Sequence, residues 1–336
     1  MSGYVSYADA RASQADQLPA AVLRCAEQIR ARQAEGELRG PGPLFVGIGN
    51  SLAATCAPVW TLRSRGIHSW RLGAGDHPVP FPRTRHPIIG VSQSGRSPET
   101  LAVLAGADAP HRYAVVNVAP SPLANAVDTL VRLGNIPDSY ASTIGFTATV
   151  AALGLIADAW DGGEFDPGWA RLPDLLGPLE TMLADRMPDA AAGLARVHYA
   201  DVVGAAESVG SAESGAVLLR EVARLPSTAM STREYLHGAM ESAGDGLHVL
   251  LGDGRELGLA DTLAGSGHRV LLVTSAAVAD GPFLRVVRVP AAPAGQRAVL
   301  EALVLQSLAG AVAEQRDVDV EQFVFHHADT KVTAME

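Results

Sequence analysis

Residues 86–107 read HPIIGVSQSGRSPETLAVLAGA, and this stretch decides the fold. The run at 88–91 is short and apolar, as in a buried strand, and it is followed by a loop of hydroxyl residues with one glycine. A helix start comes next, with Ser97 as N-cap, Pro98 at the first helical position and Glu99 in the first turn. The sequence therefore predicts a buried strand, a polar loop and a helix in direct succession.

The same succession extends through the first half of the chain. Further apolar strands are expected at LFVGIG (44–49), RYAVVNV (112–118) and DTLVRLG (128–134), and a helix at SLAATCAPVWTLRSR (51–65). Residues 8–36 precede them as a helical lead-in. Strands that alternate with helices are typical of the α/β class, in which helices flank a parallel sheet.

The second half repeats the pattern. DVVGAAES (201–208) matches LFVGIGNS, so that Val46 aligns with Val203 and Ser51 with Ser208, and the strands LHVLLG, HRVLLVTS and LRVVRVP follow in the same order. Two tandem copies of one unit are expected, each a flavodoxin-like three-layer sandwich. The expected division is a lead-in at 1–41, a first unit at 42–160, a Gly- and Pro-rich linker at 161–190, a second unit at 191–320 and a tail at 321–336.

Composition excludes several classes of function. The 336 residues are 48% hydrophobic, and a net charge of -10 offers no basic surface for nucleic acid or an anionic membrane. The most apolar stretch, 142–160, is interrupted by Thr and Asp and is expected to be a buried helix. The N-terminus lacks a signal-peptide core, and the two cysteines have no metal-ligand spacing, so a cytoplasmic protein is expected.

Three loops of the first unit place Ser, Thr or Gly where a strand is followed by a helix: GIGNS (47–51), SQSGRS (92–97) and DSYAST (138–143). Each alone is more typical of helix capping than of ligand binding, but three together favour an anion such as phosphate. The corresponding second-unit loop, GDGRELG (252–258), has no hydroxyl and two acidic residues, so one phosphate site is expected. A dinucleotide site at GIGNSL is the competing interpretation, but Leu52 replaces its third glycine.

Lys331 is the only lysine among the 26 basic residues. A lysine amine can lose its proton and form an imine, whereas an arginine can do neither. Compositional drift that spared one residue is the alternative. The single amine is therefore a candidate for a chemical role.

The chain resembles the double sugar isomerase (SIS) family, particularly the isomerase half of glutamine–fructose-6-phosphate aminotransferase (glucosamine-6-phosphate synthase). The resemblance rests on GNS (49–51), SQSGRSPET (92–100), SPLANAVDTLV (121–131), AST (141–143), LREVARLPSTAMSTREYLHG (219–238) and KVTAME (331–336). It implies two tandem SIS domains. No cysteine follows Met1, and too few residues precede the first unit for a glutaminase, so hydrolysis of glutamine is not expected.

The resemblance also implies roles for individual residues. In that family the hydroxyls of the first unit hold the sugar phosphate. The matching positions here are Ser92, Gln93, Ser94 and Ser97 for the phosphate, with Ser51 and Ser142 for the sugar.

Three further positions match the family's catalytic residues. Glu221 matches the base that moves a proton between C1 and C2, and His237 the ring-opening histidine, which the neighbouring subunit of a homodimer supplies. Lys331 matches the lysine that forms an imine with the open ketose. Each of these residues alone could equally be an ordinary surface or helix-end residue.

The implied substrate is a phosphorylated hexose or aminohexose. An aldose 6-phosphate such as glucosamine 6-phosphate would be interconverted with a ketose 6-phosphate such as fructose 6-phosphate, by isomerisation, by deamination or by amination with ammonia. The alternative is a regulatory protein that binds a sugar phosphate without turnover.

Some positions depart from the family pattern. Leu218 and Ile144 stand where the family usually has lysine, and Arg96 stands inside the phosphate loop, where an acidic residue is common. No cofactor is expected. The adjacent pair His326 and His327 raises the question of a metal, but neighbouring side chains point in different directions and no metal site is predicted.

Overall fold

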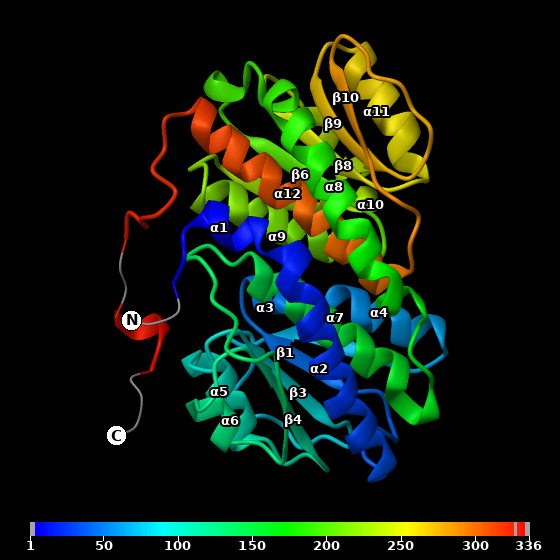
Figure 1. Cartoon of the computed structure of the whole chain (residues 1–336), viewed down its shortest axis with the longest axis vertical. Coiled ribbons are helices and arrows are strands. Elements are labelled where there is room, and N and C mark those ends of the chain that lie inside the picture. Colours follow the sequence, from blue (N-terminus) through cyan, green and yellow to red (C-terminus); the bar gives the residue numbers. More distant parts are fainter. Residues whose placement is uncertain (1–3, 326–327, 333–336) are drawn as a thin grey trace.

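The computed structural model describes residues 4–325 and 328–332. It contains two five-stranded sheets, one in each half of the chain, with helices between them and on their outer faces (Figure 1). All strand pairs in both sheets are parallel. The predicted α/β class, with two parallel sheets flanked by helices, is confirmed.

The two sheets have the same topology. The first has the order β2-β1-β3-β4-β5 and the second the order β7-β6-β8-β9-β10, so that in each the first strand lies beside the third. The first sheet consists of β1 (Leu44–Gly47), β2 (Trp70–Gly73), β3 (Ile88–Ser92), β4 (Arg112–Val116) and β5 (Thr129–Arg132). The second consists of β6 (Ala200–Gly204), β7 (Ser227–Ser231), β8 (Leu247–Leu251), β9 (Arg269–Thr274) and β10 (Leu284–Arg288).

The sequence failed to predict strands β2 and β7, which lie at equivalent edges of their sheets. No residue of β2 is buried, and β7 has one buried serine followed by exposed and half-buried residues. An edge strand is open to solvent on one side and needs no continuous apolar run. The central strands β3, β6 and β8 are buried throughout, which is why their sequences were informative.

Most helices predicted for the first half are present. They are α1 (Tyr7–Ala12), α2 (Gln14–Ala34), α3 (Asn50–Ala53), α4 (Cys56–Ser64), α5 (Pro98–Gly106), α6 (Pro122–Asn125) and α7 (Ile144–Ala159). Helix α5 starts as predicted, with Ser97 as N-cap and Pro98 in its first turn. The helix expected at 51–65 is two helices, α3 and α4, separated by a turn at residues 54–55.

Helices of the second half are α8 (Gly168–Ala191), α9 (Ser208–Glu221), α10 (Thr232–Leu236), α11 (Arg255–Gly265) and α12 (Ala294–Gln315). The Gly- and Pro-rich segment 161–190, predicted as a linker, is thus mostly helical. Its leucines at 172, 176, 179 and 183 recur at helical spacing and are buried against the core. Burial of this apolar face outweighs the three prolines inside the helix.

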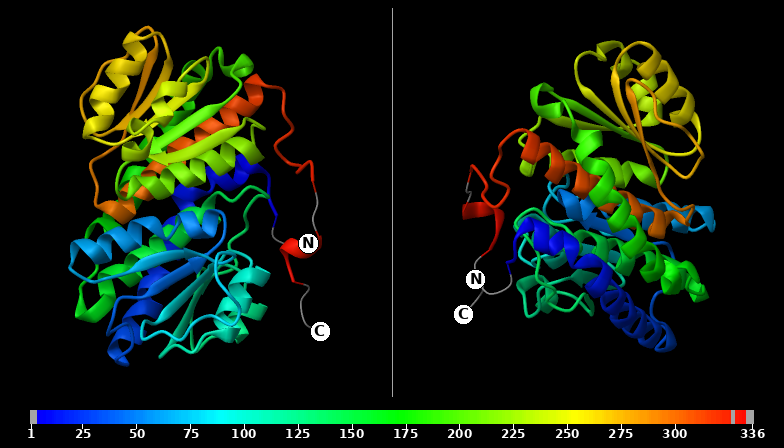
Figure 2. Two further views of the ribbon diagram at one scale, coloured as in Figure 1. Left: turned by 180° about the vertical axis from the view of Figure 1, so that it is seen from behind. Right: turned by 45° about the horizontal axis from the view of Figure 1, so that its top comes forward.

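A shared core joins the two halves. Helices α2, α7, α8, α9 and α12 pack against one another between the sheets (Figure 1; Figure 2 gives two further views). Their buried side chains form one continuous cluster with those of both sheets. The segments Ile144–Gly162 and Ala294–Gln315 are apolar and long enough to span a membrane, but 89% and 78% of their most apolar windows are buried in the protein. Both are core helices, as predicted for 142–160.

The candidate active site

A cavity of about 940 Å³ opens at the carboxyl ends of β1 and β3 and reaches the C-terminal end of α9. This is the switch point of the first sheet, where the strand order reverses and where ligands of open α/β sheets bind. The structure brings every predicted site residue except His237 to this one cavity. They are Ser51, Ser92, Gln93, Ser94, Ser97, Ser142, Glu221 and Lys331.

The SQSGRS loop offers hydroxyls at the first turn of α5. Ser92 and Ser97 are buried, and their Oγ atoms lie 3.1 Å apart. The buried Oγ of Ser94 has no hydrogen-bond partner among the described residues. Gly95 has φ +64°, and a Cβ atom there would collide with the side chain of Ser121. The loop thus presents an unpaired hydroxyl beside a helix N-terminus, which suits an anion.

The GIGNS loop forms the second wall. Gly49 has φ +56°, a conformation that favours glycine, and it turns the chain from β1 into α3. Asn50 and Ser51 follow at the first turn of α3 and line the cavity. The buried Oδ1 of Asn50 has no partner among the residues that the structure describes. A hydroxylated ligand could therefore donate to it.

The DSYAST loop is organised by Asp138, which the sequence interpretation did not single out. Its carboxylate accepts hydrogen bonds from the Oγ of Ser142 (3.0 Å), the Oγ1 of Thr143 (2.7 Å) and three backbone N–H groups, those of Ser139, Thr143 and Gly145. Burial nevertheless raises the pKa of Asp138. The only sequence signal was an aspartate at the head of a hydroxyl-rich loop. Asp138 sets the orientation of the Ser142 hydroxyl at the cavity.

Glu221 is the last residue of α9. Burial raises its pKa to about 7, and the positive charge of Lys331 acts in the opposite direction. Lys331 is itself partly exposed, yet desolvation lowers its pKa against the influence of Glu99 and Glu221. The cavity therefore holds a carboxyl group that gains and loses a proton near neutral pH, together with an amine that loses its proton more readily than usual.

The C-terminal tail carries Lys331 to the cavity. The N–H of Val332 donates to the backbone carbonyl of Arg96 (3.0 Å), so the tail is attached to the SQSGRS loop itself. Further back, the guanidinium of Arg224 donates to the carbonyls of Asp319 and Gln322. In Figures 1 and 2 the tail runs down one side of the molecule from α12 towards the N-terminal segment. The backbone of Arg96, rather than its charge, gives this position a structural role.

Aromatic side chains from three segments line the same cavity, a feature that the sequence interpretation missed. The rings of Tyr4 and Tyr140 are stacked with centroids 4.5 Å apart, and Phe323 meets Tyr140 edge-on at 5.9 Å. Tyr4 also forms a parallel bridge with Asp138. The N-terminal segment, the DSYAST loop and the tail are thus packed together at one side of the site.

His237 lies elsewhere. It is the exposed C-cap residue of α10 and does not line the cavity of its own chain. Its predicted role in a neighbouring subunit's site stays a prediction. His326 and His327 lie outside the described residues. Within the described part of the chain, no group of three or more His, Cys, Asp or Glu side chains could hold a metal ion.

The two positions where the resemblance led us to look for lysine are core positions here. Leu218 is 1% exposed and Ile144 is fully buried. A lysine ammonium at either place would have to be removed from water, at a cost of several kcal/mol. Apolar residues at these two positions therefore fit the packing of this chain.

Known proteins share this fold. A scan against protein-family models and a search of curated proteins each find no match. Among solved structures, the chain is similar to the C-terminal domain of glucosamine-fructose-6-phosphate aminotransferase from Francisella tularensis, with a TM-score of 0.79, 17% identity and coverage of 95% of this chain and 99% of that one.

Two further structures show the same likeness. Tagatose-6-phosphate ketose/aldose isomerase from Escherichia coli gives a TM-score of 0.75 at 16% identity, covering 96% of this chain and 99% of that one. Glucosamine-6-phosphate deaminase from Thermotoga maritima gives 0.71 at 20% identity, covering 94% and 98%. At these identities the matches show a shared fold over nearly the full length of each chain.

Proposed function

We propose that this chain is a double SIS-domain enzyme that interconverts an aldose or 2-amino-aldose 6-phosphate with a ketose 6-phosphate. One observation carries the proposal: three hydroxyl-rich loops, a carboxyl group with a pKa of about 7 and the only lysine of the chain all line one cavity. An isomerase and a deaminase of phosphosugars among the structures with this fold support it.

The phosphate is assigned to the SQSGRS loop. The unpaired Ser94 hydroxyl, the Ser92 and Ser97 hydroxyls and the first turn of α5 supply donors without a buried positive charge. Ser51 and Ser142 then contact the hydroxyls of the sugar. This orientation directs C1 and C2 towards Glu221 and Lys331, away from the phosphate.

Glu221 is assigned as the general base. It takes the proton from C2 of the open aldose and returns it to C1, which yields the ketose through an enediol. A base works best when its pKa is near the working pH, and the pKa of Glu221 is about 7. Opening of the sugar ring is assigned to His237 of a second copy of the chain, so the functional unit is a homodimer. A cytoplasmic enzyme fits this substrate class.

Lys331 is assigned to the carbonyl carbon. In the aminating direction its neutral amine attacks C2 of the ketose, a C=N bond forms and water leaves. Ammonia then replaces the lysine at C2, and the resulting ketimine loses a proton at C1 and gains one at C2. The lowered pKa of Lys331 makes the neutral amine more available. Deamination uses the same proton transfer: a 2-amino-aldose becomes a ketimine at C2, and water replaces the nitrogen to give the ketose and ammonia.

Turnover tests the proposal directly. The protein is incubated in D₂O with glucosamine 6-phosphate, and separately with fructose 6-phosphate and ammonia, and the products are followed by mass. Conversion with deuterium incorporated at carbon is expected, and Glu221→Gln should slow both by about 10²–10⁴-fold. Binding of either sugar phosphate without deuterium exchange or turnover would contradict the enzymatic proposal and favour a regulatory role.

Subunit complementation tests the role of His237. The inactive variants Glu221→Gln and His237→Ala are mixed, unfolded and refolded together. If each site combines residues of two chains, half of the dimers regain one intact site, and activity returns to about a quarter of wild type. No recovery would show that the site does not use His237 of a second chain.

A further inference from the structure

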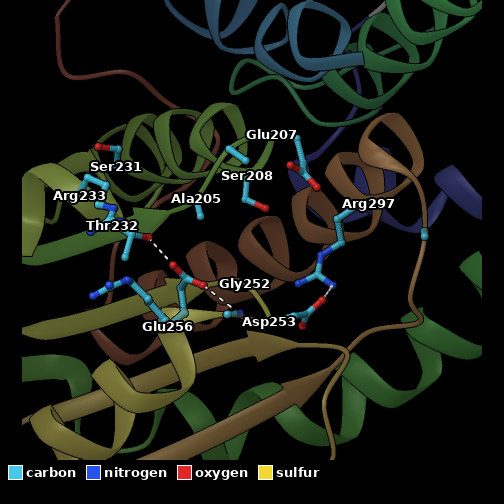
Figure 3. Close-up of a pocket in the computed structure, with 14 residues that line it drawn as sticks. Ala205, Glu207, Ser208, Ser231, Thr232, Arg233, Gly252, Asp253, Glu256 and Arg297 are labelled. Carbon is cyan, nitrogen blue, oxygen red and sulfur yellow. Dashed lines mark hydrogen bonds and ion pairs between the residues drawn. The ribbon is translucent and has the colours of Figure 1, made fainter. Parts of the chain in front are cut away.

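A second cavity, of about 370 Å³, opens at the carboxyl ends of β6 and β8 (Figure 3). This is the switch point of the second sheet, the counterpart of the place where the candidate active site lies in the first. Its volume falls in the range of small-molecule sites, about 300–1,000 Å³. None of the residues assigned to the sugar phosphate lines it.

Arg297, which lines one side of this cavity, is the centre of an ionic network. Arg297 of α12 donates to Glu301 (2.7 Å) and to Asp253 (3.2 Å), and Ser208 donates to Glu301 (2.8 Å). The side chains of Arg297 and Glu301 are only 5% and 0% exposed. Burying such charges costs several kcal/mol per ion before their mutual attraction is counted. A cavity lined by Arg297 and Asp253 is suited to a polar ligand and poorly suited to an apolar one.

The walls carry charges of both signs that have no ionic partner. Arg233, Arg255 and Glu207 line the cavity; both arginines are exposed and Glu207 is half-buried. None of the three takes part in an ion pair among the described residues. Figure 3 shows Arg233 and Glu207 on opposite sides of the cavity. A ligand that met both walls would need a positive group at one end and a negative group at the other.

A simple anion is disfavoured by the carboxylates already present. Glu256 accepts hydrogen bonds from the N–H of Gly254 (3.2 Å) and the Oγ1 of Thr232 (2.5 Å), so its own carboxylate occupies the first turn of α11. A simple cation is disfavoured by the two unpaired arginines. A molecule that carries both signs could interact with the arginines and with Glu207 at the same time.

We propose that this second cavity binds a small zwitterion, with its ammonium group at Glu207 and its carboxylate or phosphate at Arg233 and Arg255. A free amino acid and an aminosugar phosphate both have this chemistry. The site is separate from the candidate active site and does not depend on the function proposed for it.

Calorimetric titration of the full chain tests the proposal with two probes, glutamine and glucosamine 6-phosphate. At least one probe should bind wild type at a site whose affinity falls tenfold or more in the double variant Arg233→Gln/Arg255→Gln. Arg171→Gln, an exposed arginine on α8 outside both cavities, is the matched control and should leave binding unchanged. The probe whose binding is weakened in the double variant shows which kind of zwitterion the site takes. If the double variant weakens the binding of neither probe, the proposal is wrong.

Two further arms separate this site from the first cavity. Glu207→Gln should weaken the same binding event, whereas binding of glucose 6-phosphate, which lacks an amine, should not depend on Glu207, Arg233 or Arg255. Ser94→Asp places a carboxylate in the SQSGRS loop and should remove only sugar-phosphate binding at the first cavity. A site that survives Ser94→Asp but is lost with Arg233 and Arg255 supports the proposal, whatever the outcome at the first cavity. Glucose 6-phosphate binding that needs Arg233 and Arg255 would overturn the zwitterion requirement.

Discussion

The loops that follow β3 and β8 occupy equivalent places in two sheets of the same topology, yet their chemistry is opposite. In the first, SQSGRS leaves the Ser94 hydroxyl unpaired at the start of α5. In the second, Glu256 already accepts hydrogen bonds at the start of α11. A repeated backbone therefore provides the same crevice twice, and a few side chains decide whether it is open to an outside anion.

Helix α9 connects the two crevices. It begins at Ser208, which lines the second cavity, and ends at Glu221, which lines the first. Fourteen residues of α-helix span about 21 Å. The two glutamates also differ: Glu256 is held by two hydrogen bonds, whereas no hydrogen bond to the Glu221 carboxylate is seen among the described residues.

The largest effect is expected from exchanging these two carboxyl groups for amides. Glu221→Gln should lower kcat by about 10²–10⁴-fold, the contribution typical of general acid–base groups, with little change in melting temperature. Glu256→Gln should instead lower the melting temperature, because it weakens a buried hydrogen-bonded network, and leave kcat near wild type. Steady-state kinetics give kcat and calorimetry gives the melting temperature of both variants. A large loss of kcat in Glu256→Gln would contradict the assignment of different roles to the two glutamates.

The next largest effect is expected at Lys331, the only lysine. Lys331→Arg keeps the positive charge but removes the nucleophile, so turnover should fall about tenfold or more if the imine is on the path. Borohydride added with fructose 6-phosphate should also add the mass of the reduced sugar to wild type and not to the variant. Full activity in Lys331→Arg would exclude the imine.

A carboxylate can be introduced into the SQSGRS loop, so that it resembles the loop after β8. Ser94→Asp introduces a carboxylate where the phosphate is assigned, and like-charge repulsion should raise KM for the sugar phosphate at least tenfold, or about 1.4 kcal/mol. The neutral variant Ser94→Ala, which removes one hydroxyl, is the control and should have a smaller effect. Equal KM values for Ser94→Asp and wild type would show that the phosphate does not bind at this loop.

The smallest effect is a dependence on pH. We propose Glu221 as the general base, and its pKa is raised to about 7, so kcat/KM should fall about tenfold per pH unit below that value. The free energy of unfolding should change in the opposite direction, falling as the pH rises. A carboxyl whose folded pKa is raised stabilises the fold in its protonated state, so wild type should lose stability relative to Glu221→Gln as pH rises from about 5 to about 8. If the difference in unfolding free energy between wild type and Glu221→Gln is the same at pH 5 and at pH 8, the pKa of Glu221 is not raised.

The sequence by itself determined the parts that depend on local pattern. The apolar strands β3, β6 and β8, the start of α5 at Ser97 and the three hydroxyl loops were all predicted, because burial and capping leave a signal in neighbouring residues. The repeat predicted that both halves would form the same sheet. The resemblance then supplied Glu221 and Lys331, which share a cavity as expected.

Only the tertiary structure decided the parts that depend on contacts between distant segments. The edge strands β2 and β7 exist through pairing with β1 and β6, and helix α8 forms in spite of its prolines because the shared core buries its leucines. The pKa of Glu221 follows from the burial that the folded chain imposes. Lys331 is held at the cavity because the N–H of its neighbour Val332 donates a hydrogen bond to the carbonyl of Arg96. Arg96 lies more than two hundred residues earlier in the chain. Such contacts leave no local pattern, since each partner is an ordinary residue in its own segment.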